Sequence, residues 1–176
     1  MYAPSDDSYL LVDCIRQYNG TRALEIGTGS GLLLSILEKN FTYVAGSDID
    51  LQALQHCRQQ TISSNALLVC CDAGSAFGIG KFDLIVSNPP YLPNDDCYNI
   101  RDLTVHGGPT GIETTVHFVN SALPLLAWDG KMLIVISSFA DSRALDNVVV
   151  ENKMHKKVVK EKRLFYETLS LIELSI

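Results

Sequence analysis

The sequence lacks the patterns that mark secreted, zinc-binding and membrane-spanning proteins. It has five cysteines but no C-x-x-C pair, which argues against both a disulfide framework and a zinc site. The opening MYAPSDDSYLL has no basic segment followed by an apolar one, and apolar runs elsewhere are short, as in MLIVI at 132–136. We therefore expect neither a signal peptide nor a membrane span, and we predict a protein of the reducing cytoplasm.

Two smaller predictions concern the cysteines and a histidine. Cys70 and Cys71 lie in an apolar run, and this pattern predicts that both are buried as small hydrophobic residues. His56 stands beside Cys57 in a segment with helical spacing, but the sequence clusters no further ligand types around them. We therefore predict no metal site.

Basic residues are in the minority, with 14 Lys and Arg against 20 Asp and Glu and a formal net charge of -6. This balance argues against a protein that holds long nucleic acids mainly by neutralising phosphates. Six of the basic residues lie between Lys153 and Arg163. Such a run predicts a solvated face, and a docking patch for an acidic partner is the alternative.

What is present is the composition of a globular protein. The chain has 176 residues, 47% of them hydrophobic, which predicts a single domain with a sizeable core over residues 1–176. Short strand-like segments alternate with segments of helical spacing. The predicted strands cover residues 22–27, 43–48, 66–71, 82–88 and 131–136, with two more in the tail 157–176. The predicted helices cover residues 31–40, 50–60 and 112–126.

This alternation predicts an α/β fold. Strand, helix and strand in this rhythm are typical of a mostly parallel sheet with helices on both faces. The tail has two strand candidates without a long helix between them, so the sheet should end in an antiparallel pair. Sheets of this kind bind ligands beyond the carboxyl ends of their strands, where the strand order reverses. We expect the functional site there.

Polar residues follow several of the predicted strands at this edge. Asp48 ends the second strand, where an acidic side chain suits the two hydroxyls of a ribose. Asp72 follows the third strand and, with Ala73 beside it, suits the amino group of a purine. Asn88 follows the fourth strand. The set predicts a ligand that contains a nucleoside.

The first strand leads into a turn with the spacing G-x-G-x-G, formed by Gly27, Gly29 and Gly31, with Glu25 before it. Glycines let the backbone approach a ligand closely, and the N–H groups of the turn are expected to face an anion or carboxylate. A similar turn cradles pyrophosphate in nicotinamide enzymes, but the Glu25 carboxylate would repel a pyrophosphate and balance a cationic ligand. This favours S-adenosylmethionine, which carries a sulfonium, an ammonium and one carboxylate.

The stretch FDLIVSNPPYLPNDD turns a strand directly into a polar amide, two prolines and an aromatic ring. Proline fixes its own φ and restricts the residue before it, so Asn88 and Pro89 have little conformational freedom. The Asn88 side-chain oxygen and the Pro89 carbonyl can each accept one N–H of a planar NH₂ group, which orients its nitrogen and stabilises its developing charge. Tyr91 can stack on the flat face of that group. The stretch therefore predicts methyl transfer to an amide or aromatic-amine nitrogen.

These residues carry a resemblance to a known family. The segment from Glu25 to Gly31, together with Asp48, Asp72 and Asn88-Pro89-Pro90-Tyr91, resembles the class I methyltransferases of the HemK type in order and spacing. The match covers nearly the whole chain and implies a Rossmann-like, seven-stranded fold with S-adenosylmethionine as cofactor. In this family the N-P-P-Y signature occurs in enzymes that methylate glutamine side chains of peptide-release factors, or adenine in DNA or RNA.

Two further segments resemble the short branch of HemK-like enzymes found in archaea and eukaryotes. Residues 2–8 match its Y-x-P-x-[ED]-D-[ST] start, in which the position of Ser8 contacts the cofactor. Residues 106–113 match its G-G-x-x-G-x-E stretch. This branch methylates the glutamine of the G-G-Q loop in class 1 release factors, and the resemblance implies the same function. Ser8 stands where threonine is common, and residues 92–96 lie in a loop that varies in the family.

The branch also implies a partner, a small zinc-binding activator protein that adds a strand to an edge of the sheet. The third predicted strand, residues 66–71, is apolar on both alternating faces and suits that edge, with an ordinary buried strand as the alternative. The loop 92–111 is predicted to form a wall of the substrate slot. Two other functions stay open, an adenine N6-methyltransferase acting on DNA or RNA and an inactive binding module of the same fold.

Overall fold

The computed structural model describes residues 4–60, 66–94 and 104–176. Parts of two segments singled out in the sequence, namely Tyr2 and Ala3 of the opening and residues 95–96 of the variable loop, lie outside this range. In the described part of the chain, no helix is both long and apolar enough to cross a membrane.

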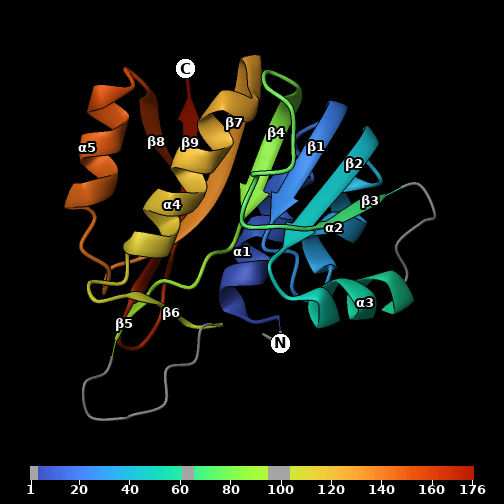
Figure 1. Ribbon diagram of the computed structural model, residues 1–176. Helices are drawn as coiled ribbons and strands as arrows, with labels where there is room; N and C mark the ends of the chain where they lie inside the picture. Colours follow the sequence, from blue (N-terminus) through green and yellow to red (C-terminus); the bar gives the residue numbers. More distant parts are fainter. Residues whose placement is uncertain (1–3, 61–65, 95–103) are drawn as a thin grey trace.

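A sheet of seven strands forms the centre of the fold, in the order β3-β2-β1-β4-β7-β9-β8 (Figure 1). Its strands are β1 (Gly20–Ile26), β2 (Phe41–Asp48), β3 (Leu67–Cys70), β4 (Phe82–Ser87), β7 (Leu126–Ser137), β8 (His155–Arg163) and β9 (Thr168–Ser175). The first five of these strands run parallel to one another, and β9 is antiparallel to both of its neighbours, β7 and β8. The predicted parallel sheet with an antiparallel C-terminal end is confirmed.

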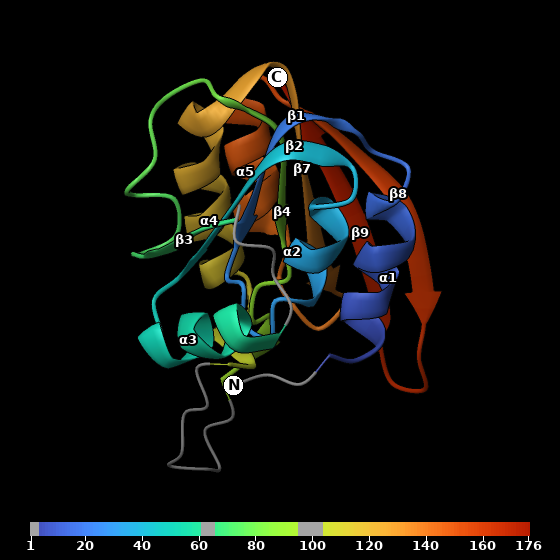
Figure 2. The same ribbon diagram turned by 90° about the vertical axis from the view of Figure 1, so that its right-hand side faces the viewer.

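Helices cover both faces of the sheet, as the alternation predicts. They are α1 (Asp6–Ile15), α2 (Leu32–Leu37), α3 (Leu51–Gln60), α4 (Glu113–Ala122) and α5 (Arg143–Glu151), with a 3-10 turn η1 (Leu123–Leu125) after α4. Figure 2 shows α4 and α5 on one side of the sheet and α1 and α2 on the other. The sequence analysis did not predict α1 or α5, nor the small two-stranded sheet of β5 (Leu92–Pro93) and β6 (His106–Gly108).

Two apolar cores result from the alternation of side chains along the central strands. Ala23 and Leu84 pack in the cluster under α1 and α2, whereas their neighbours Leu24 and Ile85 pack in the cluster under α4 and α5. All four are almost completely buried. Fully burying a side chain of the size of Leu or Ile stabilises a fold by about 1.5–3 kcal/mol, so this strict alternation fixes which face each strand presents to each helix.

The chain reverses its direction of strand addition between β1 and β4. It adds β2 and β3 on one side of β1 and then returns to place β4 on the other side. The connections that leave β1 and β4 therefore diverge, and a crevice opens at their carboxyl ends. Ser87 at the end of β4 donates a hydrogen bond from Oγ to the carbonyl of Ile26 at 2.8 Å, which joins the two strands at that point.

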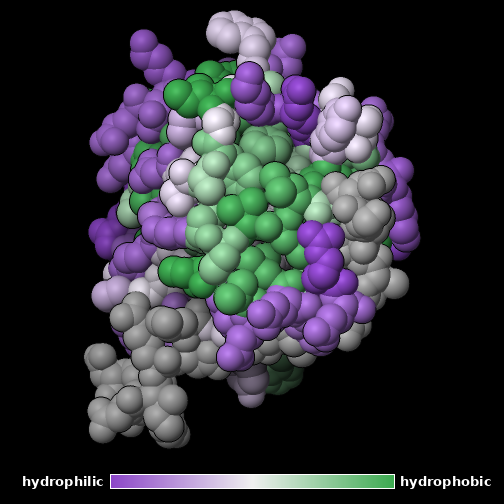
Figure 3. Space-filling view, turned by 45° about the vertical axis from the view of Figure 1, so that its right-hand side comes forward, coloured by the Kyte–Doolittle hydropathy of each residue, from purple (hydrophilic) through white to green (hydrophobic). Residues whose placement is uncertain are grey.

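The strand β3 lies at an edge of the sheet, so the expectation of an edge strand is confirmed and the alternative of an ordinary buried strand is wrong. The predicted burial of the two cysteines is also wrong, because Cys70 is exposed and Cys71 is half-buried. The reason is that β3 has a neighbouring strand on one side only. Figure 3, in which this side of the molecule comes forward, shows a broad apolar area framed by hydrophilic residues.

The basic run lies on β8, at the opposite edge of the sheet. Three of its lysines form ion pairs with aspartates of the same chain, from α1 and α5: Lys156–Asp146 at 2.6 Å, Lys160–Asp13 at 2.9 Å and Lys162–Asp6 at 2.8 Å. All of these pairs are at least partly exposed. The prediction of a solvated face is confirmed.

Candidate active site

Two adjoining cavities lie at the carboxyl ends of the central strands. The Glu25 cavity has a volume of about 270 Å³, and its wall includes Glu25, Asn88 and Tyr91. The Asp48 cavity has a volume of about 550 Å³, and its wall includes Asp48 and Asp72. The two cavities share part of their lining, namely Gly27, Gly29, Asn88, Pro90 and Thr104. Together they form one continuous site in the crevice between β1 and β4.

The structure brings nearly all of the predicted site residues to these cavities. Those in the wall of the Glu25 cavity are Ser8, Glu25, Gly27, Gly29, Asn88, Pro89 and Tyr91. Those in the wall of the Asp48 cavity are Gly27, Gly29, Asp48, Asp72, Ala73 and Asn88. Gly31 lines neither of the two and instead precedes α2 with a left-handed φ of 78°.

The glycine-rich turn acts differently from the anion cradle that its sequence predicts. The N–H groups of Gly27 and Thr28 donate to the carbonyl of Ser47, at 2.8 and 3.0 Å. That of Gly29 donates to Oδ2 of Asp48 at 2.9 Å. These three N–H groups are used within the protein, so the prediction that they bind an anion of the ligand is wrong. The turn still leaves its backbone open at Gly29, which has a φ of 46°. Apart from Gly29 itself and its two chain neighbours, no described residue has a heavy atom within 4 Å of where a Cβ would stand.

Glu25 is a buried carboxylate at the end of β1. It is 2% exposed, and its Oε2 has no hydrogen-bond partner among the described residues. Burial raises the pKa of Glu25 well above its usual range, and the negative charge of Asp48 adds to that effect, while a backbone hydrogen bond from Leu34 opposes it. Burying a charge is costly unless a partner of opposite charge is present. The position therefore suits a cationic ligand group.

The two aspartates of the Asp48 cavity already have partners in the protein. Asp48 accepts hydrogen bonds from the backbone N–H groups of Gly29 and Asp50, both at 2.9 Å, which fix its carboxylate in place. Each carboxylate oxygen can accept a second hydrogen bond, so capacity for a ligand remains. Asp72 lies 2.8 Å from Nε2 of His117 on α4, a pair that is more than half exposed. The sequence analysis did not single out His117.

Ala73 lies beside Asp72 in an uncommon backbone conformation. Its φ is 45°, in the left-handed region that residues with a Cβ seldom adopt, and its side chain is buried. Such conformations cost energy and are concentrated at sites that bind ligands.

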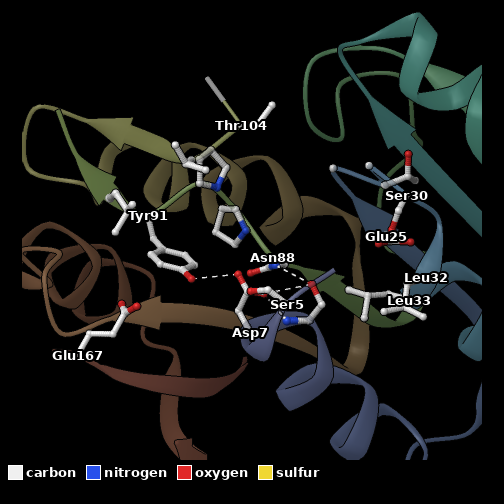
Figure 4. A pocket seen from close by; sticks show the side chains of 18 residues that line it. Ser5, Asp7, Glu25, Ser30, Leu32, Leu33, Asn88, Tyr91, Thr104 and Glu167 are labelled. Carbon is white, nitrogen blue, oxygen red and sulfur yellow. Dashed lines mark hydrogen bonds between the residues drawn. The ribbon is translucent and has the colours of Figure 1, made fainter. Parts of the chain in front are cut away.

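Asn88 follows β4 and points one end of its amide at α1. Its Nδ2 donates to Oγ of Ser8 at 3.4 Å. Its Oδ1 is buried, and no described residue donates a hydrogen bond to it. Figure 4 shows Asn88 between Tyr91 on one side and Glu25 on the other. A buried acceptor without a donor is rare in proteins, and this one belongs to a residue that lines both cavities.

Asp7 is a site residue that the sequence analysis missed. It is 2% exposed, and its Oδ2 accepts a hydrogen bond from the Tyr91 hydroxyl at 3.0 Å (Figure 4). Its Oδ1 accepts from the hydroxyls of Ser5 and Ser8, both at 3.1 Å. Tyr91, Asp7, Ser8 and Asn88 thus form a hydrogen-bonded chain. Helix α1 holds both ends of the N-P-P-Y tetrapeptide through this chain.

Two of the three glycines in residues 106–113 lie directly on the same tetrapeptide. A Cβ on Gly107 would stand 2.3 Å from the carbonyl oxygen of Pro90. One on Gly111, whose φ is 83°, would stand 2.5 Å from the carbonyl oxygen of Tyr91. Only glycine permits such close backbone contact. This segment follows residues Thr104 and Val105, which line the Glu25 cavity as the predicted slot wall requires, while residues 95–103 of that loop lie outside the described range.

Two buried hydroxyls complete the polar lining. Thr28 Oγ1 in the Glu25 cavity and Ser47 Oγ in the Asp48 cavity have no partner in the described part of the chain. The sequence analysis did not name these two hydroxyls, but it identified the region from their sequence neighbours Gly27 and Asp48. Among the described residues, no group of three or more His, Cys, Asp or Glu side chains is placed to hold a metal ion.

Comparisons with known proteins agree with this arrangement. A protein of Methanocaldococcus jannaschii with the provisional name protein N5-glutamine methyltransferase is 28% identical over 152 residues, covering 84% of this chain and 77% of that protein. The release factor glutamine methyltransferase of Deinococcus radiodurans is 29% identical over 136 residues. That match covers 72% of this chain but only 49% of the longer relative.

The fold comparison points the same way. A chain in the structure of the E. cuniculi Mtq2-Trm112 complex, described as responsible for methylation of the translation termination factor eRF1, superposes with a TM-score of 0.78. It covers 99% of this chain and 97% of the other at 24% identity, which shows a common fold. The family model of the methyltransferase small domain matches residues 6–166. The chain therefore belongs to the methyltransferase small domain family, and the expected HemK-type class I methyltransferase fold is confirmed.

Proposed function

We propose that this methyltransferase uses S-adenosylmethionine to methylate the side-chain nitrogen N5 of the glutamine in the G-G-Q loop of a class 1 peptide-release factor. The observation that carries the proposal is Oδ1 of Asn88, which is buried and has no donor among the described residues, on a residue in the wall of a cavity of about 270 Å³. The names of the relatives from M. jannaschii and D. radiodurans support the choice of glutamine.

The residues of the site fit the proposed cofactor. Glu25 offers a buried carboxylate with one oxygen to which no described group donates, which suits the ammonium group of the methionine part. Asp48 would hold the ribose hydroxyls, and Asp72 with Ala73 would hold the purine amino group. Ser8 lines the Glu25 cavity close to Asn88 and would contact the methionine part. When bound, the cofactor supplies an electrophilic methyl group on a positively charged sulfur.

The chain's own residues make the acceptor nitrogen reactive. The lone pair of a carboxamide nitrogen is delocalised, so the nitrogen becomes a nucleophile only in a restricted geometry. Oδ1 of Asn88 and the carbonyl of Pro89 each accept a hydrogen bond from one N–H of this nitrogen. The two bonds orient its lone pair and stabilise the positive charge as it develops. Tyr91 covers the flat face of the group, and Asp7 holds the tyrosine ring through its hydroxyl. The methylated nitrogen then loses one proton to water.

The test is transfer of a labelled methyl group to a release-factor domain that carries G-G-Q. We expect label on the glutamine amide, and none on a domain in which this glutamine is replaced by alanine. An Asn88→Ala variant that still binds the cofactor serves as the matched enzyme control. Labelling of adenine in DNA or RNA oligonucleotides, without transfer to the domain, would replace the proposal by the nucleic-acid alternative.

The nucleic-acid alternative depends on the basic run, and three of its six basic residues already form ion pairs within the chain. Lys156, Lys160 and Lys162 form ion pairs with aspartates of the chain itself. The run lies on β8, at the end of the sheet away from β3. Proteins that bind nucleic acid usually gather cations whose charge is left for phosphates. These pairs therefore support the protein substrate.

We also propose the partner that the family resemblance implies, a small zinc-binding protein that adds a strand at β3. Leu67 on this strand is 57% exposed, and Cys70 is exposed as well. An apolar edge strand is a template for pairing with another chain, which supports this position. Leu67→Asp should lower the affinity for the partner about tenfold or more in a pull-down titration. Trp128→Asp, at an exposed apolar residue elsewhere, is the control and should leave that affinity unchanged.

A further inference from the structure

The turn between β8 and β9 carries two aromatic side chains that face solvent. Phe165 is 91% exposed and Tyr166 is 82% exposed. Their rings touch edge to face, with centroids 4.7 Å apart. Tight turns favour Gly, Asn, Asp or Pro, whose backbone preferences or small polar side chains suit them. Two large aromatic rings at this point have no function in the turn itself.

The turn is firmly held by its flanking residues. The N–H of Leu164 donates to the carbonyl of Glu167 at 2.8 Å, which closes the turn around the two rings. Leu164 packs against the core, and the Glu167 carboxylate accepts a hydrogen bond from Oγ of Ser137 at 2.6 Å. The rings are therefore presented on a fixed base, which lowers the entropy that a binding partner must overcome.

The same turn borders the active site. Glu167 lines the Glu25 cavity together with Tyr91 (Figure 4). This follows from topology, because β9 is antiparallel to β7 and Leu169 pairs with Ser137 at the carboxyl end of β7. Figure 1 shows the connection between β8 and β9 at the same end of the molecule as β5 and β6. A molecule with one group in the cavity would extend over this rim.

We propose that Phe165 and Tyr166 dock the body of a folded acceptor protein, outside the loop whose side chain enters the Glu25 cavity. The inference rests on the proposed function. The acceptor enters the Glu25 cavity with one side chain, so the remainder of a folded acceptor protein has to lie on the rim. Exposed aromatic rings are the side chains that most often anchor protein interfaces, and they meet an apolar patch of the partner.

The test compares a G-G-Q release-factor domain with a short peptide that contains only the G-G-Q segment. The double substitution Phe165→Ser and Tyr166→Ser should raise KM for the domain about tenfold and leave kcat, cofactor affinity and the KM for the peptide unchanged. Trp128→Ser is the matched control, because Trp128 is 87% exposed near the start of β7, at the other end of that strand from Ser137.

Each other outcome has a defined meaning. An unchanged KM for the domain would overturn the docking role. An equal rise in KM for the domain and the peptide would also overturn it, because the turn would then shape the cavity itself. A wild-type enzyme that transfers no methyl group to the domain would overturn the proposed function, and the docking role with it.

Discussion

The two halves of the site differ in how their polar groups are satisfied. In the Asp48 cavity the carboxylates already have partners, since Asp48 accepts two backbone hydrogen bonds and Asp72 faces His117. In the Glu25 cavity, oxygens of Glu25 and Asn88 are buried without a donor among the described residues. Carboxylates that are already held in place, as in the Asp48 cavity, suit the recognition of a part of the cofactor that does not react. In the Glu25 cavity, the carboxylate of Glu25 suits a cationic group of the cofactor, and Oδ1 of Asn88 suits the reacting nitrogen, whose hydrogen bonds strengthen as charge develops.

The largest expected effect is on turnover, from a change in the Glu25 cavity. Asn88→Ala should lower kcat on the order of 10²-fold or more, because the acceptor nitrogen loses its orientation and its charge stabilisation. Cofactor affinity should stay nearly intact in calorimetry. Asn88→Asp keeps an acceptor oxygen and should retain more activity than Asn88→Ala. Full turnover in Asn88→Ala would show that Asn88 does not orient the reacting nitrogen, and the proposed difference between the two cavities would be wrong.

The next effect is on binding, from a change in the Asp48 cavity. Asp48→Ala should weaken the binding of S-adenosylmethionine or of its demethylated product by about 1.5–3 kcal/mol, since a charge-assisted hydrogen bond is lost. At saturating cofactor, kcat should change much less than in Asn88→Ala. Asp48→Asn, which keeps one acceptor oxygen, should show an intermediate affinity. An affinity equal to that of the wild type would remove Asp48 from the cofactor site.

Glu25→Gln sharpens the comparison because it should act in opposite directions on binding and on stability. Cofactor affinity should fall about tenfold, because the ligand's cation loses its countercharge. The substitution should stabilise the ligand-free protein, and the gain over the wild type should grow as the pH rises. The pKa of Glu25 is raised in the folded protein. At pH values above the ordinary pKa of a glutamate, the folded protein therefore keeps a proton that the unfolded chain has released. The free energy of unfolding of the wild type consequently falls as the pH rises.

The measurement for Glu25→Gln is urea unfolding without cofactor at about pH 5 and about pH 8. The advantage of the variant over the wild type should be larger at the higher pH. If this advantage does not grow with pH, burial does not disfavour the ionised form of Glu25. That result would weaken the assignment of a cationic ligand group to this position.

The smallest effect concerns the exposed pair in the Asp48 cavity. His117→Ala frees Asp72 from a partner that competes with the purine amino group. Exposed pairs contribute only about 0–1 kcal/mol, so cofactor affinity should rise by at most a few-fold. Asn120→Ala, one turn further along α4, is a suitable control. A tenfold loss of affinity in His117→Ala would show instead that the histidine itself contacts the cofactor.

Local sequence patterns were enough to predict the central strands and the placement of site residues at the carboxyl ends of these strands. Short segments rich in apolar residues identified β1, β2 and β4, and parallel strands necessarily bring their carboxyl ends to one edge. Glu25, Asp48 and Asn88 followed from that rule alone. Helix α1 was also within reach, because Leu10, Leu11, Cys14 and Ile15 are apolar at helical spacing and are buried.

Features that depend on distant contacts were not predictable in this way. Asp7 is buried because its carboxylate meets the hydroxyl of Tyr91, which is 84 residues away in the sequence. The exposure of Cys70 depends on β3 being an edge strand, and strand order is not encoded in the strand itself. The N–H groups of the glycine-rich turn bond to Ser47 and Asp48 on β2, so the role of the turn depended on a neighbouring strand.

The contact between residues 107–111 and the N-P-P-Y tetrapeptide has a consequence for mutational tolerance. Gly107 and Gly111 meet carbonyl oxygens of Pro90 and Tyr91 with no side chain between them, so every other amino acid at either position forces two backbone segments apart. Pro109, between them, is exposed. A saturation library of this segment should therefore show that Gly107 and Gly111 accept only glycine, whereas the exposed Pro109 between them accepts many residues.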